Sequence, residues 1–367
     1  MGKQIIYVLC IIACIIVSIH LCAAQSSHKM GPSPATLDEY DFVARGKMSG
    51  DREARPEQIA RMDNNGEILL ACLEAKTGGQ LQSSGLKFLQ SQLELLVDWN
   101  LLEYDSINKT YNTTVHVYGI DEATAIRRKV NEAVNELAME LNTDVQSLKN
   151  HLSQMGREKA LFAIFYAYIL HGYAMQQFGD EIYQQPQLSG EYPFWKGYAW
   201  AIYPKKKFGA GVFSMPVEGD QFFIVSAAGS PRLDFKQFMA FVKDAAVDHK
   251  VDDPELRKSL SGFDLFDDEG NLTVPTFEKD WSMKLENIAK NVFSKTTELA
   301  NDKGMKVILG METLAQAEMF LHYEIRHAFL IHLLERGTIP VPFDFENEDN
   351  NSPSDVGNLT FLMKVIK

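Results

Sequence analysis

The residues best suited to chemistry gather near the C-terminus, where carboxylates and imidazoles recur at helical spacing. The candidate metal ligands are Glu318, His322, Glu324 and His327, and His332 follows them. At about 100° per residue, Glu318, His322 and His332 share one stripe of a helix, whereas Glu324 and His327 share the opposite face. Because imidazole and carboxylate groups bind zinc and iron, this pattern leaves a metal-dependent enzyme open as an alternative function.

A metal site on this helix would need further ligands from facing helices. The Glu-x-x-His spacing of Glu324 and His327 resembles that of di-iron helical bundles, in which a second such motif and two more carboxylates complete the site. The equivalent apolar stretch at 161–175 offers only His171. We therefore expect structural histidines and no metal or other cofactor.

A second group that could bind a ligand is aromatic and lies in the middle of the chain. Tyr192 and Phe194 precede the four candidate contact residues, which are Trp195, Tyr198, Trp200 and Tyr203. Trp and Tyr offer a large contact area to sugars, peptides or proteins, so an exposed binding strip is one interpretation. Strand alternation also places Tyr198 and Trp200 on one face, and burial in a core is the competing interpretation.

Familiar catalytic signatures are missing from the sequence. There is no Gly-x-Ser-x-Gly nucleophile elbow and no His-Glu-x-x-His zinc motif. Cys72, within Leu69–Leu73, has the setting of a small buried hydrophobe. The leading prediction is a non-enzymatic protein that binds a small-molecule ligand or a protein partner between two related helical lobes and a small β element.

Residues 1–24 have the layout of a secretion signal. Lys3 is followed by the apolar run Ile5–Leu21 and by Cys22-Ala23-Ala24, whose small residues suit cleavage before Gln25. An uncleaved signal that anchors the chain in a membrane has the same apolar length and stays an alternative. We expect a secreted, periplasmic or otherwise extracytoplasmic protein with no membrane span after signal cleavage.

Beyond the signal, the pattern predicts a mainly α protein with small β elements, of the α+β class. The expected segments are an irregular N-terminal arm at 25–56, a helical copy at 57–179, a β meander at 180–232, a second helical copy at 234–337 and an acidic C-terminal tail at 338–367. The apolar stretch at 161–175 is short for a membrane span, so we expect a buried helix.

The most informative feature is an internal duplication. Equivalent landmarks share one offset along the chain: Val115 and Val274 are 159 residues apart, Ile126 and Leu285 are 159 apart, and Gly179 and Gly337 are 158 apart. Each copy shows a hairpin, then a long amphipathic helix, then an apolar helix. Because related units of this kind bury their apolar faces against each other, we expect two copies around a pseudo-twofold axis.

Each copy also resembles a winged-helix module. The resemblance rests on Asn100–Tyr104 with Tyr111–Val115 in the first copy and on Asp264–Val274 in the second, where a helix exit leads into a two-stranded wing. It implies a small module of helices and a hairpin, and many such modules bind DNA. The net charge of −13 and the lone Lys87 in the helix around 86–99 argue against phosphate contacts, so a nucleic-acid-binding protein is the least favoured alternative and we expect no nucleic acid partner.

Overall fold

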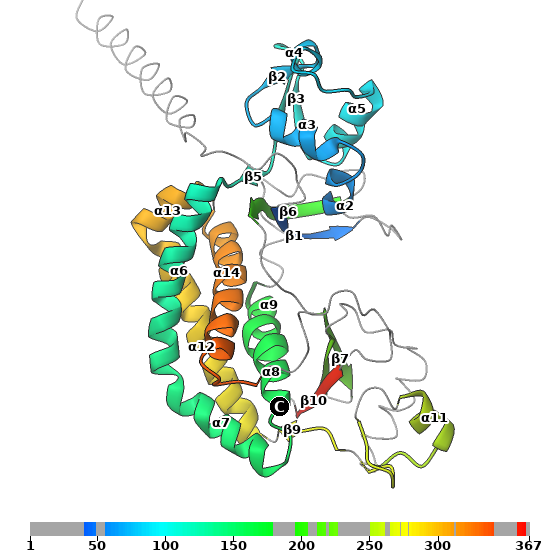
Figure 1. Cartoon of the computed structure of the whole chain (residues 1–367), viewed down its shortest axis with the longest axis vertical. Coiled ribbons are helices and arrows are strands. Elements are labelled where there is room, and N and C mark those ends of the chain that lie inside the picture. The colour runs from blue at the N-terminus through cyan, green and yellow to red at the C-terminus, as the bar shows by residue number, and fades with distance from the viewer. Residues whose placement is uncertain are drawn as a thin grey trace, which may run out of the picture.

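The fold is mainly α with small β elements, as the sequence predicts. The computed structural model describes residues 40–48, 56–178, 195–204, 211–217, 220–226, 250–260, 265–271, 273–277, 279–311, 313–340 and 358–364. A small α/β module stands at one end of a helical bundle, and two further small sheets lie beside the bundle (Figure 1). No helix in these ranges is both long enough and apolar enough to cross a membrane.

The N-terminal module alternates short helices with strands. Its elements are α2 (Pro56–Ala60), α3 (Asn65–Ala71), β2 (Lys76–Thr77), α4 (Gly78–Ser83), α5 (Gln90–Asp98), β3 (Leu102–Asp105) and β4 (Thr110–Thr113). The strands form an antiparallel sheet in the order β2-β4-β3. Leucines at helical spacing, such as Leu69, Leu93 and Leu96, are fully buried in a core that is separate from that of the bundle.

A side-chain clasp closes the hairpin between β3 and β4. The Asp105 carboxylate accepts hydrogen bonds from the Ile107 amide at 2.8 Å, the Asn108 amide at 3.1 Å and the Asn108 side chain at 2.6 Å. These three hydrogen bonds hold the pKa of Asp105 below its usual value. The bond from the Asn108 backbone amide contributes most. Later in the chain, Asp267 accepts from the Asn271 amide at 2.8 Å and from its side chain at 2.9 Å, so a similar Asp–Asn clasp closes that turn.

The bundle is built from long helical columns whose apolar faces point inward. The first column is α6 (Ile120–Glu140), which continues into α7 (Asn142–Gln154). The next consists of α8 (Ala160–Ala163), the π-helical segment η2 (Ile164–Gly172) and α9 (Tyr173–Phe178). The second half supplies α12 (Lys279–Asn301), α13 (Lys303–Leu309) and α14 (Leu314–Glu335), after the short α11 (Pro254–Ser259).

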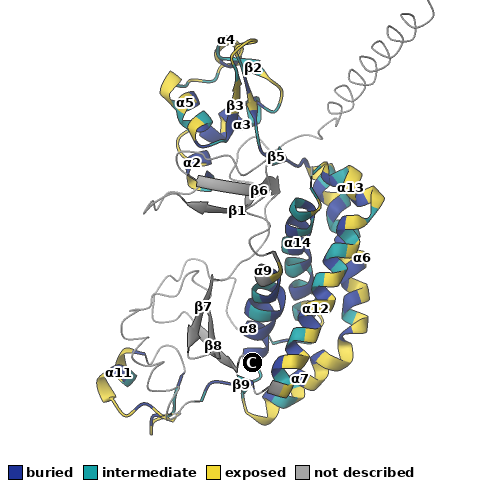
Figure 2. Cartoon of the chain, turned by 180° about the vertical axis from the view of Figure 1, so that it is seen from behind, coloured by how far each residue is buried: buried dark blue, intermediate teal, exposed yellow. Residues whose placement is uncertain are grey.

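Burial follows the spacing of apolar residues in these helices. Exposed residues cover the outer faces of α6, α7 and α12, and buried ones face the other columns (Figure 2). Phe162, Phe165 and Leu170 are fully buried. This confirms that the apolar stretch at 161–175 is a core helix.

Capping side chains set where the helices of the second half begin. Asp302 accepts from the Met305 amide at 2.7 Å at the start of α13. Thr313 and Gln316 form a reciprocal capping box at the start of α14. Each cap satisfies amides that the first turn of a helix leaves without an internal partner.

The first flanking sheet joins three segments that are far apart in sequence. Its middle strand is β6 (Trp195–Pro204), which pairs antiparallel with β1 (Tyr40–Met48) and parallel with β5 (His116–Val117). The arm predicted to be irregular at 25–56 therefore contains a regular strand. Its composition is poor in large apolar residues, but backbone hydrogen bonds to a strand about 150 residues away stabilise it regardless of local pattern.

The second flanking sheet depends on the C-terminal segment. Its strands follow the order β7 (Gly211–Val217), β8 (Asp220–Ser226), β10 (Asn358–Lys364) and β9 (Thr276–Phe277). The tail predicted at 338–367 thus ends in an interior strand, whereas its acidic stretch around 344–349 lies outside the described residues. The strands predicted within 180–232 exist, but they do not form one meander, because β6 belongs to the first sheet and the β7–β8 hairpin to the second.

From β5 and from β9 onward, the bundle contains two series of helices in a similar order, which we call the first half and the second half. The long helix α12 begins at Lys279, 159 residues after α6 begins at Ile120. A shorter helix follows each, α7 or α13, and then a buried apolar column, α8–α9 or α14. The two-residue strands β5 and β9 precede the long helices, and each pairs in parallel with a strand of its flanking sheet. Helix α6 packs on α14, and α12 packs on η2.

Candidate functional site

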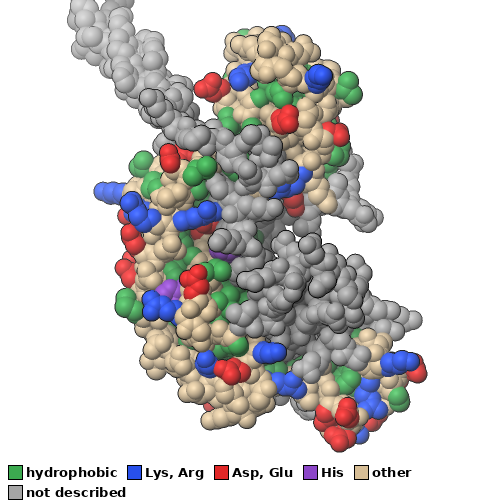
Figure 3. Space-filling model, in the orientation of Figure 1, with side chains coloured by type: hydrophobic (Ala, Val, Ile, Leu, Met, Phe, Trp, Pro, Cys, Tyr) green, Lys and Arg blue, Asp and Glu red, His purple; other side chains and the backbone are tan. Residues whose placement is uncertain are grey.

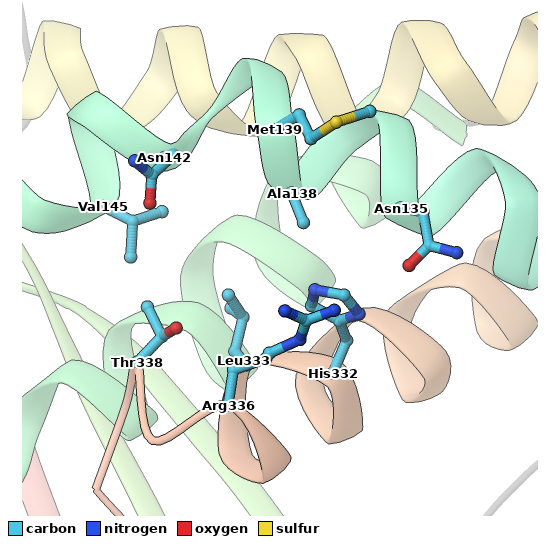
Figure 4. Close-up of a pocket in the computed structure, with 9 residues that line it drawn as sticks. All are labelled: Asn135, Ala138, Met139, Asn142, Val145, His332, Leu333, Arg336 and Thr338. Carbon is cyan, nitrogen blue, oxygen red and sulfur yellow. The ribbon is translucent and has the colours of Figure 1, made fainter.

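A groove lies where α6 meets α7, between these two helices and the C-terminal end of α14. Asn135, Ala138, Met139, Asn142 and Val145 form one wall, His332, Leu333, Arg336 and Thr338 form the other, and the volume is about 770 Å³. The two sets face each other across the gap, and Ala138 and Val145 point toward α14 (Figure 4). We call this the α14 groove.

A second, more open groove follows α7 and has a volume of about 590 Å³. It shares Asn142 with the α14 groove, so the two adjoin. Its lining consists of uncharged hydrogen-bonding side chains and one indole: Asn142, Thr143, Gln146, Ser147, Asn150, His151, Gln154 and Trp281. Trp281 stands on α12, so this α7 groove also draws on both halves.

The sequence of α7 explains why this lining is polar. Val145, Leu148 and Leu152 are buried against the bundle, and the groove residues occupy the remaining circumference of the helix. A capping-box pattern suggests that Thr143 and Gln146 mark a helix start. Helix α7 does begin next to Thr143, at Asn142. Because α6 runs into it through Leu141 in a helical conformation, both side chains are exposed along the groove.

Trp281 forms a wall of the α7 groove and contacts three neighbours. Its indole stacks on the His151 imidazole with ring centroids 4.3 Å apart, lies 6.5 Å from the Phe277 ring, and has the Lys284 ammonium 4.4 Å from its centroid. Burial, helped by the positive charge of Lys284, holds the pKa of His151 below its usual value. His151 is therefore uncharged at neutral pH, and so is the whole lining of the α7 groove.

His332 and Arg336 give the α14 groove a different polarity. Burial, together with the charge of Arg336, lowers the pKa of His332, while Glu335 acts in the opposite direction. An uncharged imidazole can accept one hydrogen bond and donate another, and the guanidinium beside it can only donate. The sequence indicated His332 only as part of a metal-binding pattern, and the structure places it in a groove.

The four predicted metal ligands are not brought together. His322 is buried, and its Nε2 lies 2.7 Å from a carbonyl oxygen of η2. Glu324 is also buried and lies 3.7 Å from Arg127 of α6. Glu318 and His327 are half-buried at other positions of α14. Throughout the described ranges, no three His, Cys, Asp or Glu side chains are grouped so that they could hold a metal ion.

A polar contact beside these residues had no signal in the sequence. Arg326 donates to His171 Nδ1 at 2.7 Å and to the Tyr166 hydroxyl at 2.8 Å. Because Nδ1 accepts this bond, the ring proton of His171 stands on Nε2. The contact ties α14 to η2. The usual helical period could not indicate it, because the wider π-helical turns change which side chains face α14.

The four predicted aromatic contact residues lie on β6. Trp195, Trp200 and Tyr203 each stand opposite a residue of β1, and Tyr198 lies where the register shifts. Their side chains, and all of Tyr192 and Phe194, fall outside the part of the chain that the structure describes in that detail. Their role as a binding strip stays a prediction.

Cys72 is fully buried in the N-terminal module, as its apolar neighbours indicate. Burial raises the pKa of its thiol to about 11, although Lys76 partly opposes this. The thiol is therefore protonated at neutral pH and is not a nucleophile.

The described surface of the N-terminal module carries little positive charge. Residues 56–117 include four Lys or Arg against eight Asp or Glu. Lys87 is exposed just before α5, but Glu94 and Asp98 are exposed on α5 itself. Acidic and basic side chains are interspersed over the face shown in Figure 3. Phosphate recognition needs clustered cations, and this module does not present them.

No family model, no curated protein and no solved structure matches the chain.

Proposed function

We propose that the chain is an exported, non-enzymatic binding protein that holds a ligand in the two adjoining grooves between its halves. One observation carries the proposal: α6 and α7 supply one side of the grooves, and α12 and α14 supply the other. Clefts between packed units are common sites for ligands. Half of the lining side chains are amides and hydroxyls, which bind and orient a ligand but do not exchange protons near neutral pH.

The proposal includes an internal duplication, in which 57–179 and 234–337 are copies of one unit. Three observations support it. The long helices begin 159 residues apart, the Asp-Asn clasp closes a turn in both halves, and β5 and β9 make the same kind of parallel pairing. A ligand between the halves would then lie between two related surfaces.

We also propose that residues 56–117 form a winged-helix-like module. Its support is the order helix, strand, two helices and hairpin from α3 to β4, with β4 central in the sheet. The excess of acidic residues favours a role in protein contact or architecture over contact with nucleic acid.

Export is inferred from residues 1–24, which lie outside the described ranges. We expect mass spectrometry of the secreted protein to find Gln25 at its N-terminus. An intact Met1 on a membrane-bound protein would instead support the anchored alternative.

A thermal-shift screen tests ligand binding in the grooves. The panel contains neutral oligosaccharides, short peptides, small carboxylic acids and nucleotides. Asn142→Trp places a large ring where the grooves adjoin, and Ser153→Trp, on an exposed position of α7 outside the lining, is the matched control. We expect at least one compound to raise the Tm of the unaltered chain and of Ser153→Trp but not that of Asn142→Trp. A ligand at about 100 times its Kd stabilises by roughly 2.7 kcal/mol, which such a scan resolves.

The same screen can contradict the proposal. A panel that leaves the Tm unchanged, or shifts it equally in Asn142→Trp, would remove the grooves as the site. Mass spectrometry of the recovered compound should find it unaltered, and a converted compound would identify an enzyme.

The metal-dependent alternative has its own test. We expect elemental analysis of the purified chain to find no stoichiometric zinc or iron, because the buried His322 and Glu324 already contact η2 and α6. One metal atom per chain that is lost in His327→Ala would make the enzyme the better proposal.

A further inference from the structure

The lining of the α7 groove points to one class of ligand. We propose that it binds a neutral saccharide chain, a conclusion that rests on the function proposed above and names its ligand. Four amides recur every four residues along α7, namely Asn142, Gln146, Asn150 and Gln154. A helix rises about 1.5 Å per residue, so successive amides stand about 6 Å apart along its axis. This arrangement can contact consecutive units of an extended ligand.

The hydrogen-bonding chemistry of this lining matches hydroxyl groups. Each amide side chain can both donate and accept, and so can each sugar hydroxyl. Thr143 and Ser147 add two hydroxyls on the same side of α7. An anionic ligand would be matched by several Arg or Lys and a cationic one by carboxylates, whereas the lining contains no charged residue, and Lys284, over the Trp281 ring, brings one positive charge to its edge. A neutral, polyhydroxylated ligand therefore fits best.

These side chains are also available for binding, unlike the amides of Gln80 and Gln92. Gln80 accepts from the Thr77 amide at 2.7 Å, and Gln92 donates to Asn64 at 3.0 Å, so both have structural roles. The four amides of the α7 groove are exposed and make no side-chain hydrogen bond to another residue within the described ranges. Exposed amides of this kind are hydrated in solution, and a ligand can replace that water.

Trp281 supplies the apolar surface that a sugar ring requires. Its indole is half-buried at the edge of the groove, where the stack on His151 fixes its orientation. Lys284 lies over the ring from an exposed position. A cation–π contact at an exposed site is weak, so a sugar ring can displace the ammonium and pack its C–H face on the indole.

An extended peptide is the main competitor for such a surface, because its backbone also alternates donors and acceptors. Peptide recognition, however, relies on pockets that hold side chains. The α7 groove is open, and the indole is its one clearly apolar lining group. The lining therefore favours the saccharide.

The experiment uses the full mature chain, a glycan array of neutral and acidic oligosaccharides, and a panel of extended peptides, followed by calorimetric titration of the strongest binders. The test variant is Gln146→Ala/Asn150→Ala, and Ser153→Ala on the same helix is the control. All three positions are exposed, so each variant should keep the Tm of the unaltered chain. We expect a neutral oligosaccharide to bind, with an affinity about tenfold weaker in the double variant and unchanged in the control.

Each outcome separates this proposal from the one on which it rests. Peptide binding that the double variant weakens, without saccharide binding, would overturn the ligand class and leave the groove as the site. Saccharide binding that the double variant does not weaken would overturn the placement on α7. Binding of neither class, together with a thermal-shift screen in which no compound acts, would overturn both proposals.

Discussion

His151 is the side chain whose protonation should affect the α7 groove most directly. Its pKa is lowered in the folded chain, chiefly by burial, so the unfolded chain takes up its proton first as the pH falls. The stability that the neutral imidazole contributes is thus fully present above its ordinary pKa of about 6.5, and is lost as the pH falls through that value toward the lower folded one. We expect the urea midpoint to fall less between neutral and mildly acidic pH in His151→Gln than in the unaltered chain.

A control for this titration lies in the α14 groove. The pKa of His332 is also lowered, so some pH dependence should persist in His151→Gln and should shrink further when His332→Gln is added. If the urea midpoint of the double variant depends on pH as much as that of the unaltered chain, the fold does not lower the pKa of either imidazole.

Phe165 tests the core at the same scale. It is fully buried in η2 with its ring 6.2 Å from that of Phe329 on α14. Phe165→Ala should lower the free energy of unfolding by about 3 to 5 kcal/mol, because it removes apolar contacts and leaves a cavity. Met139→Ala, at an exposed position, should change it by less than about 0.5 kcal/mol. A loss well below 1 kcal/mol at Phe165, measured by denaturant unfolding, would contradict the packing of this column.

Among the elements, α13 begins at a single side-chain cap. Asp302 accepts from the Met305 amide and from Lys129 of α6 at 2.8 Å, and the bond to Lys129 contributes most to lowering its pKa. Asp302→Ala should reduce the free energy of unfolding by about 1 to 2 kcal/mol. Lys303→Ala, exposed at the first position of the same helix, is the control and should have little effect. Equal melting curves for the two variants would mean that the cap is unimportant.

The sequence predicts those elements whose pattern is local. Apolar residues at helical spacing indicate α6, α12 and α14, Asp253 before Pro254 indicates α11, and the turn around Asn108 indicates the β3–β4 hairpin. Strands β1 and β10 were missed because each is stabilised by a partner far away in sequence, and their own residues carry little signal.

The grooves were missed for a related reason. In the sequence, the polar face of α7 has the pattern of an ordinary solvated surface. Only the fold shows that Trp281 of α12 lies beside it. His332 illustrates the same limit, because its helical spacing relates it to Glu318 and His322, whereas its groove partners come from α6 and α7. Helical spacing shows which residues share a face, but not what that face meets.

At the scale of the whole molecule, the end segments complete the sheets. Deletion of 358–367 removes β10 from between β8 and β9, which leaves unpaired backbone groups on β8. We expect this truncated chain to melt at a clearly lower temperature and to associate in size-exclusion chromatography. Deletion of 365–367 alone retains β10 and should leave both properties unchanged. Equal melting of the two truncated chains would contradict the position of β10.

The interior position of β10 also determines the order of events during synthesis. The second flanking sheet can close only after residues 358–364 have been synthesised, because β10 lies between β8 and β9. The first sheet likewise cannot form until β6 has been synthesised, more than 140 residues after β1. Such distant pairings make folding slow. This delay would suit the export proposed from residues 1–24, because a nascent polypeptide whose sheets are still open can pass through a translocation channel before it folds.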